Sequence, residues 1–393
     1  MNFAKLPKLV AIGLSVVTLA GCETIGGWFA EDDYDPTAPV ELTDIEQKVK
    51  LSKRWSTSIG DGQGKGFYKI TPALAGGTLY VAATEGLVAA VDATSGRKLW
   101  SAELGLAISG GVGHYKDSLF LGGADGTVMR VDANDGSEIW RAEVSGEVLA
   151  APQGNGELVV AQTYDGKVFA FDYESGEQRW VHLSDVPVLT LRGTSTPIMV
   201  DNFAIAGFAD GKVLALSLDN GSVAWEARIA IPQGRSEIER IVDIDGSMAM
   251  QSGELYAASY QGRVAAVDLR VGRKIWQQNV SSVSGVAVGF GNVYVADQDG
   301  TVSAYLRNGQ GVRWQNIQLG YRGLSRPTVV SSYVALVDFE GYLHLFSQLD
   351  GDIVGRTRPD SSGARADMIA QGNRLYIYSN DGKLMAYDVA GLE

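Results

Sequence analysis

Short apolar stretches separated by turns recur along most of the chain, with a period of about 43 residues. Each repeat contains a stretch of small residues, two apolar stretches joined by a turn of the Asp-Gly type, and a last stretch that usually ends near a tryptophan. Apolar and polar residues alternate within these stretches, as is typical of β-strands, and no helical period competes with this pattern. The pattern therefore predicts four short strands in each repeat.

Eight such repeats account for residues 51–393, with related segments at 79–100, 119–140, 158–180, 203–225, 255–276, 293–314, 333–355 and 375–391. The first six segments end at tryptophans spaced 40, 40, 45, 51 and 38 residues apart, namely Trp100, Trp140, Trp180, Trp225, Trp276 and Trp314. The seventh segment has Gly355 where a tryptophan is expected. Four-stranded units of this length are typical of a β-propeller, in which each blade packs on its neighbours. We predict an all-β, eight-bladed propeller with four antiparallel strands in each blade.

The two ends of the repeat region complement each other. The eighth repeat ends near Gly391 without its tryptophan strand, and the stretch from Leu51 to Trp55 supplies a strand of that kind. We therefore expect the N-terminal strand to complete the last blade and close the ring, which would leave no exposed sheet edge at the junction.

The first residues are predicted to be a signal peptide rather than part of the fold. Lys5 and Lys8 precede an apolar run from Leu9 to Ala20, which is too short to span a bilayer. The run ends at Cys22, the sole cysteine, in a sequence similar to the lipobox of bacterial lipoproteins. We predict a signal peptide over residues 1–21, an acylated Cys22 with an acidic tether over 22–50, and one propeller domain over 51–393. The sequence leaves open whether the tether lies along the folded domain.

Composition and charge argue against several classes of function. The net charge of -13 argues against nucleic acid as a partner, because phosphates would be repelled. The single cysteine and three histidines offer little for a metal centre, and no nucleophile-elbow, zinc-protease or P-loop motif is present. We therefore predict no catalytic site, no cofactor and no metal.

The run at residues 90–100, AVDATSGRKLW, resembles the tryptophan-docking motif of pyrroloquinoline-quinone dehydrogenase propellers. This resemblance implies the eight-bladed fold but not the activity, since propellers host unrelated functions. Those enzymes typically carry adjacent cysteines over the cofactor, which this chain lacks.

The lipobox, residues 187–195 and residues 236–245 together are similar to the BamB family, the propeller lipoproteins of the bacterial outer-membrane β-barrel assembly machinery. The resemblance implies a non-enzymatic scaffold that is anchored by lipid at the periplasmic face of the outer membrane. It also implies binding to the POTRA domains of BamA, and it leaves contact with nascent barrel proteins open. The partner-binding residues that it implies are Leu189, Leu191, Arg192, Asp243 and Asp245.

A direct interpretation of these five positions is also available. Both segments connect a blade-closing tryptophan to the next blade. The tryptophan spacings of 45 and 51 around them exceed 40, so these connections are long, and long loops on a rigid scaffold commonly bind partners. The leucines could be apolar anchors and Arg192 could pair with the partner, with the two aspartates either orienting Arg192 or receiving a basic residue. Alternatively, the leucines pack under the loop and the carboxylates cap turns. A small molecule or polysaccharide in the central channel remains another alternative.

Overall fold

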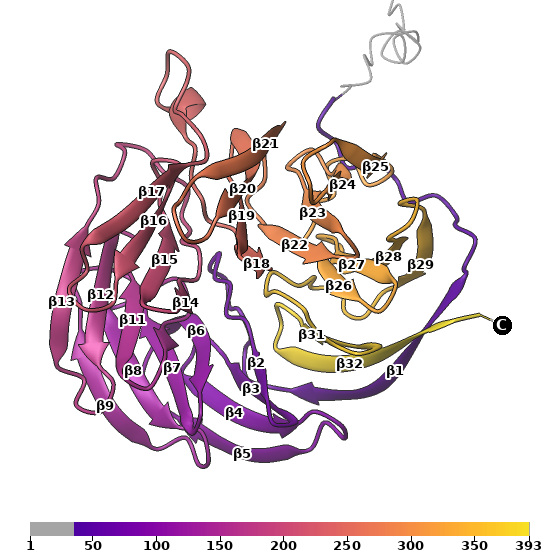
Figure 1. The fold of residues 1–393 in the computed structure, drawn as a ribbon. Helices are drawn as coiled ribbons and strands as arrows, with labels where there is room; N and C mark the ends of the chain where they lie inside the picture. Colours follow the sequence, from indigo (N-terminus) through magenta and orange to yellow (C-terminus); the bar gives the residue numbers. More distant parts are fainter. Residues whose placement is uncertain (1–34, 393) are drawn as a thin grey trace, which may run out of the picture. The chain divides into compact units, whose positions relative to one another are not determined.

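The computed structural model describes residues 35–392, so the predicted signal peptide and Cys22 lie outside the described residues. A compact folded unit begins at Pro39 and includes every strand. Within residues 35–392, none of the helical segments has the length and apolar character needed to cross a membrane. Figure 1 shows the strands grouped into sheets that follow one another around a ring.

Eight antiparallel sheets of four strands form the blades, which confirms the predicted fold class. Blade 1 comprises β2 (Ala73–Ala75), β3 (Thr78–Ala82), β4 (Leu87–Asp92) and β5 (Lys98–Glu103), and blade 2 comprises β6 (Ile108–Tyr115), β7 (Ser118–Gly123), β8 (Thr127–Asp132) and β9 (Glu138–Glu143). Blade 3 comprises β10 (Gln153–Gly154), β11 (Leu158–Gln162), β12 (Lys167–Asp172) and β13 (Gln178–Leu183), and blade 4 comprises β14 (Ile198–Val200), β15 (Phe203–Gly207), β16 (Lys212–Ser217) and β17 (Val223–Arg228).

Blade 5 comprises β18 (Ala249–Gln251), β19 (Glu254–Ala258), β20 (Gly262–Asp268) and β21 (Lys274–Val280), and blade 6 comprises β22 (Val286–Gly289), β23 (Asn292–Ala296), β24 (Val302–Leu306) and β25 (Val312–Asn316). Blade 7 comprises β26 (Thr328–Val330), β27 (Tyr333–Val337), β28 (Leu343–Ser347) and β29 (Ile353–Thr357), and blade 8 comprises β30 (Ile369–Gln371), β31 (Arg374–Tyr378), β32 (Lys383–Gly391) and β1 (Val49–Ser58). One short 3-10 helix, η1 (Ile238–Arg240), lies between blades 4 and 5.

The core lies between the blades. Each large cluster of buried apolar side chains draws on two neighbouring sheets, as between blades 3 and 4 or between blades 7 and 8. The middle strands of each blade supply most of these residues because both of their faces are covered. Stacking of neighbours therefore builds the ring, as expected for a repeat architecture.

Seven tryptophans each join one blade to the next, at every junction of the ring except the one between blades 7 and 8. Each indole Nε1 donates a hydrogen bond of 2.7–3.2 Å to a backbone carbonyl of the following blade, and each ring lies over a turn glycine there. At Gly136 the backbone has φ +79°, and an added Cβ would lie 2.7 Å from the Trp100 ring. Glycine is therefore required at this turn both for its backbone conformation and for the close approach of the ring.

The N-terminal strand closes the ring as predicted. β1 pairs antiparallel with β32 over nine residue pairs from Val49↔Gly391 to Ser58↔Lys383. Trp55 then donates its indole hydrogen bond to Ala93 of blade 1. The first and last parts of the chain thus share one blade, and β1 covers the edge that β32 would otherwise expose.

Blade 7, which has Gly355 in place of the tryptophan, is covered by the chain that leads into β1. A Cβ at Gly355 would lie 3.4 Å from the Cβ of Val49, and Lys48 N–H donates to the Val354 carbonyl at 2.8 Å. The side-chain amide of Gln47 exchanges hydrogen bonds of 2.7 and 3.1 Å with the backbone of Arg356. The small residue at position 355 therefore leaves room for the N-terminal segment.

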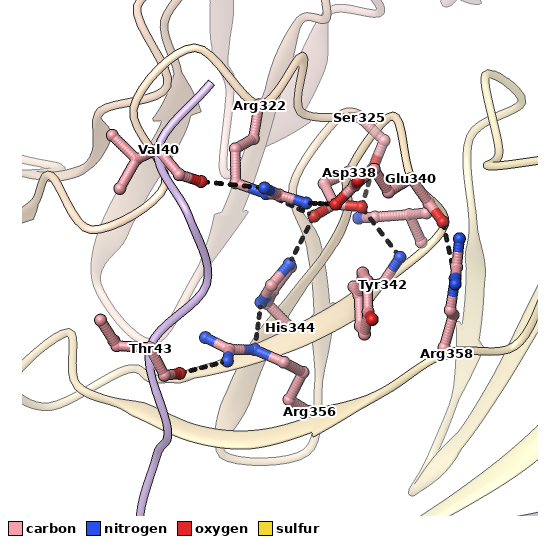
Figure 2. A network of polar contacts seen from close by, with 11 residues as sticks. Val40, Thr43, Arg322, Ser325, Asp338, Glu340, Tyr342, His344, Arg356 and Arg358 are labelled. Atoms are coloured by element: carbon pink, nitrogen blue, oxygen red, sulfur yellow. Dashed lines mark hydrogen bonds and ion pairs between the residues drawn. The ribbon is translucent and has the colours of Figure 1, made fainter. Parts of the chain in front are cut away.

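Residues 39–48, which we call the strap, lie along blade 7 (Figure 2). Arg322 donates to the Val40 carbonyl at 2.9 Å, and Arg356 donates to the Thr43 carbonyl at 2.6 Å. Leu42 and Ile45 pack against the apolar cluster between blades 6 and 7. The C-terminal part of the predicted tether therefore lies along the folded domain, which decides a question that the sequence left open.

Candidate functional site

Two long connections on one face of the propeller carry the five predicted site residues. Residues 184–197 join β13 to β14, and residues 229–248 join β17 to β18 and include η1, as can be followed in Figure 1. Because strands alternate in direction within each blade, every connection from an outermost strand to the next innermost strand leaves on the same side. We call this side the loop face.

The first connection exposes apolar side chains. Val188 is 92% exposed and Leu189 is 40% exposed, while Leu191 is only partly buried. Val188 and Leu189 line a groove of about 360 Å³ between the two connections, together with Pro232 and Arg240 of η1. The alternative in which Leu189 packs under the loop therefore does not describe this residue.

Asp243 joins the two connections through a buried contact. Its carboxylate is 1% exposed, and Oδ2 accepts a hydrogen bond from the Leu191 backbone N–H at 2.5 Å. The other oxygen, Oδ1, has no hydrogen-bond partner among the described residues. Asp243 therefore positions the backbone that presents Leu191, and its own side chain is not accessible to a partner.

Arg192 is held by residues that the sequence analysis did not single out. Its Nη2 donates to both carboxylate oxygens of Glu147 at 2.7 and 2.8 Å, and its guanidinium lies 5.0 Å from the centre of the Tyr68 ring. Glu147 precedes blade 3 and Tyr68 precedes blade 1. The carboxylate that orients Arg192 is thus Glu147, rather than Asp243 or Asp245 as one interpretation had it.

Asp245 lies against the backbone of the first connection. A Cβ at Gly193 would lie 2.7 Å from Cγ of Asp245, so glycine allows this close approach. Burial raises the pKa of Asp245 to about 7, although the positive charge of Lys69 opposes the shift. Burial also raises the pKa of Asp243 to about 8, and repulsion from Asp245 adds to that shift. Both carboxyl groups therefore keep their protons at pH values well above those at which an aspartate ordinarily ionises.

These raised pKa values predict a stability that falls with pH. An aspartate in the unfolded chain has a pKa of about 3.9, so between about pH 4 and pH 8 the folded chain holds a proton on Asp243 that the unfolded chain releases. Each such group lowers the free energy of unfolding by up to about 1.4 kcal/mol per pH unit across its window. Asp243→Asn should make this dependence shallower, because an amide does not ionise and its oxygen can still accept from Leu191.

Urea unfolding at several pH values between about 5 and 8 would measure this slope. Asp185→Asn is a matched control, because Asp185 is exposed in the same connection. Equal slopes for the wild type and Asp243→Asn would contradict the prediction.

The structure thus brings Leu191, Arg192 and Asp245 to one cavity at the centre of the loop face, with a volume of about 480 Å³. Leu189 lines the neighbouring groove instead, and Asp243 lies behind the first connection. Glu147 and Tyr68 could not have been found from the sequence, because they lie in two other connections, between β9 and β10 and between β1 and β2, and no pattern along the chain pairs them with Arg192. Among residues 35–392, no group of three or more His, Cys, Asp or Glu side chains is placed to hold a metal ion.

Comparisons with known proteins agree with the predicted resemblance. A family model described as outer membrane protein assembly factor BamB matches residues 52–105 and 84–316. The outer membrane protein assembly factor BamB of Pseudomonas aeruginosa is 45% identical over 385 residues, which cover 98% of this chain and 99% of the relative. The protein of the same name from Vibrio cholerae is 34% identical over 380 residues, with 96% of each chain covered.

Solved structures show the same architecture. The crystal structure of BamB from Moraxella catarrhalis matches with a TM-score of 0.78 and 28% identity, over 86% of this chain and all of the other. The quinohemoprotein alcohol dehydrogenase from Comamonas testosteroni matches with a TM-score of 0.68 and 15% identity, over 90% and 78% of the two chains, which is a likeness of fold alone. On the strength of the near-complete alignments to the bacterial relatives, the chain belongs to the family of the outer membrane protein assembly factor BamB.

Proposed function

We propose that this chain is a non-catalytic scaffold lipoprotein of the outer-membrane β-barrel assembly complex, and that it binds the periplasmic POTRA domains of BamA. In this role it would assist the folding and insertion of β-barrel proteins. Support comes from the names of its relatives, which are outer membrane protein assembly factors. The distant dehydrogenase neighbour carries no argument for catalysis, because at 15% identity only the fold is shared.

The observation that carries the proposal is the arrangement of the two long connections on the loop face. Exposed Val188 and Leu189 offer apolar contact area, and Arg192 is already oriented by Glu147 before a partner arrives. An exposed apolar patch beside an ordered arginine is the composition of a protein-binding hot spot. A pre-ordered arginine also loses less side-chain entropy on binding.

The strap begins beside this same face. Val40 N–H donates to the carbonyl of Gly320, which lies between β25 and β26 in another loop-face connection. From there the strap runs along blade 7 to the start of β1. We propose that Cys22 is acylated and holds the chain at the periplasmic side of the outer membrane.

A binding titration with the purified POTRA domains of BamA would test the proposal. All eight blades, including the strand that closes the ring, lie within residues 49–391, so a chain of residues 23–393 keeps the whole propeller. Saturable binding is expected. If the wild type showed no binding at protein concentrations of tens of micromolar, the proposal would fail, and a small ligand of the central cavity would become the better candidate.

A further inference from the structure

Side-chain contacts between three blades lie between the cavity at the centre of the loop face and a second cavity in the ring. These contacts are made by Arg326, whose Nη1 lies 3.2 Å from Oδ2 of Asp367, and by Ser247, whose hydroxyl donates to the same oxygen at 2.5 Å. These residues precede the innermost strands of blades 7, 8 and 5, so the contacts cross the channel. The second cavity, of about 380 Å³ and lined by Ser247 and Asp367, lies beyond them. We call the first cavity the central cup.

The walls of the central cup combine apolar side chains with excess positive charge. Leu191 and Leu324 line it, and Phe67, whose side chain is 80% exposed, stands at its rim. Four cationic side chains and one acidic side chain belong to the same wall, namely Lys69, Arg192, Arg326, Arg365 and Asp245. A positive site of this kind stands out in a chain whose net charge is -13.

Arg365 and Lys69 are the two cations of the wall that form no ion pair within residues 35–392, and Lys69 acts electrostatically on Asp245. Arg192 and Arg326 face Glu147 and Asp367, but Arg365 forms no ion pair within residues 35–392. Its guanidinium donates to the carbonyl oxygens of Gly64 and Gly66 and to Oδ1 of Asn380. These neutral acceptors satisfy hydrogen bonds without neutralising the charge, and burial lowers the pKa of Arg365 accordingly. A carboxylate in the cup would supply the missing counter-charge.

We propose that the central cup receives an acidic segment of the protein partner, with a carboxylate paired to Arg365 and an adjoining apolar side chain packed against Phe67 and Leu191. The volume of about 480 Å³ suits one or two side chains inserted from a loop rather than a flat contact. The inference rests on the proposed function, because it assigns this segment to the POTRA domains of BamA. It extends the site from the two long connections to the opposite wall of the cup, at blades 7, 8 and 1.

The test is a titration of the chain of residues 23–393 with purified POTRA domains, at low and at moderate salt. Arg365→Gln should raise Kd about tenfold and weaken its salt dependence, because a charge-assisted contact is lost. Phe67→Ala should also raise Kd, and its exposed position means that the fold does not depend on it. Arg358→Gln is the matched control, since this exposed arginine lies near the loop face but outside the cup.

The outcomes separate this inference from the proposed function. If Arg365→Gln and Phe67→Ala bind like the wild type while Arg192→Ala binds weakly, the partner uses the long connections and the central cup stays empty, so the inference is wrong and the proposed function stands. If the wild type itself does not bind, the proposed function fails and the inference fails with it. Weaker binding in both cup variants, with Arg358→Gln unchanged, is the supporting result.

Discussion

Asp338→Ala is expected to lower the free energy of unfolding by about 3–5 kcal/mol, because it leaves buried polar groups without their partner. The Asp338 side chain is fully buried and accepts from Nε of Arg322 at 2.7 Å, from Nε2 of His344 at 3.1 Å and from the backbone of Tyr342 at 2.9 Å (Figure 2). The side chain of Arg322 is only 4% exposed. Removing the carboxylate would leave the Arg322 guanidinium buried away from water without this ion-pair partner.

The protonation states within this network follow from its geometry. Arg356 Nε donates to Nδ1 of His344 at 3.1 Å, so the proton of the neutral imidazole lies on Nε2 and faces Asp338. Burial lowers the pKa of His344 and therefore favours this neutral form. Burial would raise the pKa of Asp338, but the hydrogen bonds from His344, Tyr342 and Arg322 hold it below its ordinary value. The carboxylate is therefore the charge that balances Arg322.

Glu340→Ala provides the matched control for this prediction. Glu340 also pairs with Arg322, but its side chain is 44% exposed, so its loss should cost less than about 1 kcal/mol. Urea unfolding of both variants would measure the difference. The prediction is contradicted if Asp338→Ala costs no more than Glu340→Ala, since the network would then contribute little despite its burial.

Asp338→Ala should also weaken the contacts that hold the strap against blade 7. Arg322 and Arg356, which are both tied to this network, hold the carbonyl oxygens of Val40 and Thr43. Amide hydrogen exchange at Val40 and Lys48, whose N–H groups donate to Gly320 and Val354, should become faster in Asp338→Ala than in Glu340→Ala. Unchanged exchange at both amides would show that the strap is held by its apolar contacts.

Arg192→Ala is expected to weaken binding to the POTRA domains by about 2 kcal/mol or more, which corresponds to roughly a 30-fold higher Kd. The reason is that Arg192 is exposed, is ordered by Glu147 and Tyr68, and lines the central cup beside Leu191. Leu191→Ala should weaken binding by a similar mechanism, through loss of an apolar anchor at the mouth of the central cup. Both titrations require circular dichroism to show that the fold is intact.

Arg179→Ala is the matched control for the arginine variant. Arg179 lies on β13 with a side chain that is 56% exposed, and it pairs with Asp172 at 3.5 Å, so it resembles Arg192 in type and exposure but not in place. Its replacement should leave Kd unchanged. Equal binding by the wild type, Arg192→Ala and Leu191→Ala would show that the interface lies on another part of the propeller. The family membership would not be affected.

The fold was predictable because its defining contacts repeat and are encoded by residue type. A tryptophan at the end of one repeat and a turn glycine in the next, such as Trp100 and Gly136, recur at a regular spacing, and each pair joins neighbouring blades. The missing tryptophan of the last repeat and its counterpart at Trp55 similarly indicated how the ring closes. The residue pattern within one repeat is sufficient to predict the fold, because each blade packs only on its neighbours.

The sequence by itself thus determined the eight-bladed architecture, the closing strand and the two long connections, the first of which carries Leu191 and Arg192. Only the tertiary structure decided that Asp243 is buried behind Leu191, that Glu147 holds Arg192, and that the strap covers blade 7 beside Gly355. These contacts join connections and termini that share no repeated pattern, and whether a carboxylate faces a partner or the backbone depends on its burial. Burial is a property of the packed ring, which the spacing of residues along one repeat does not encode.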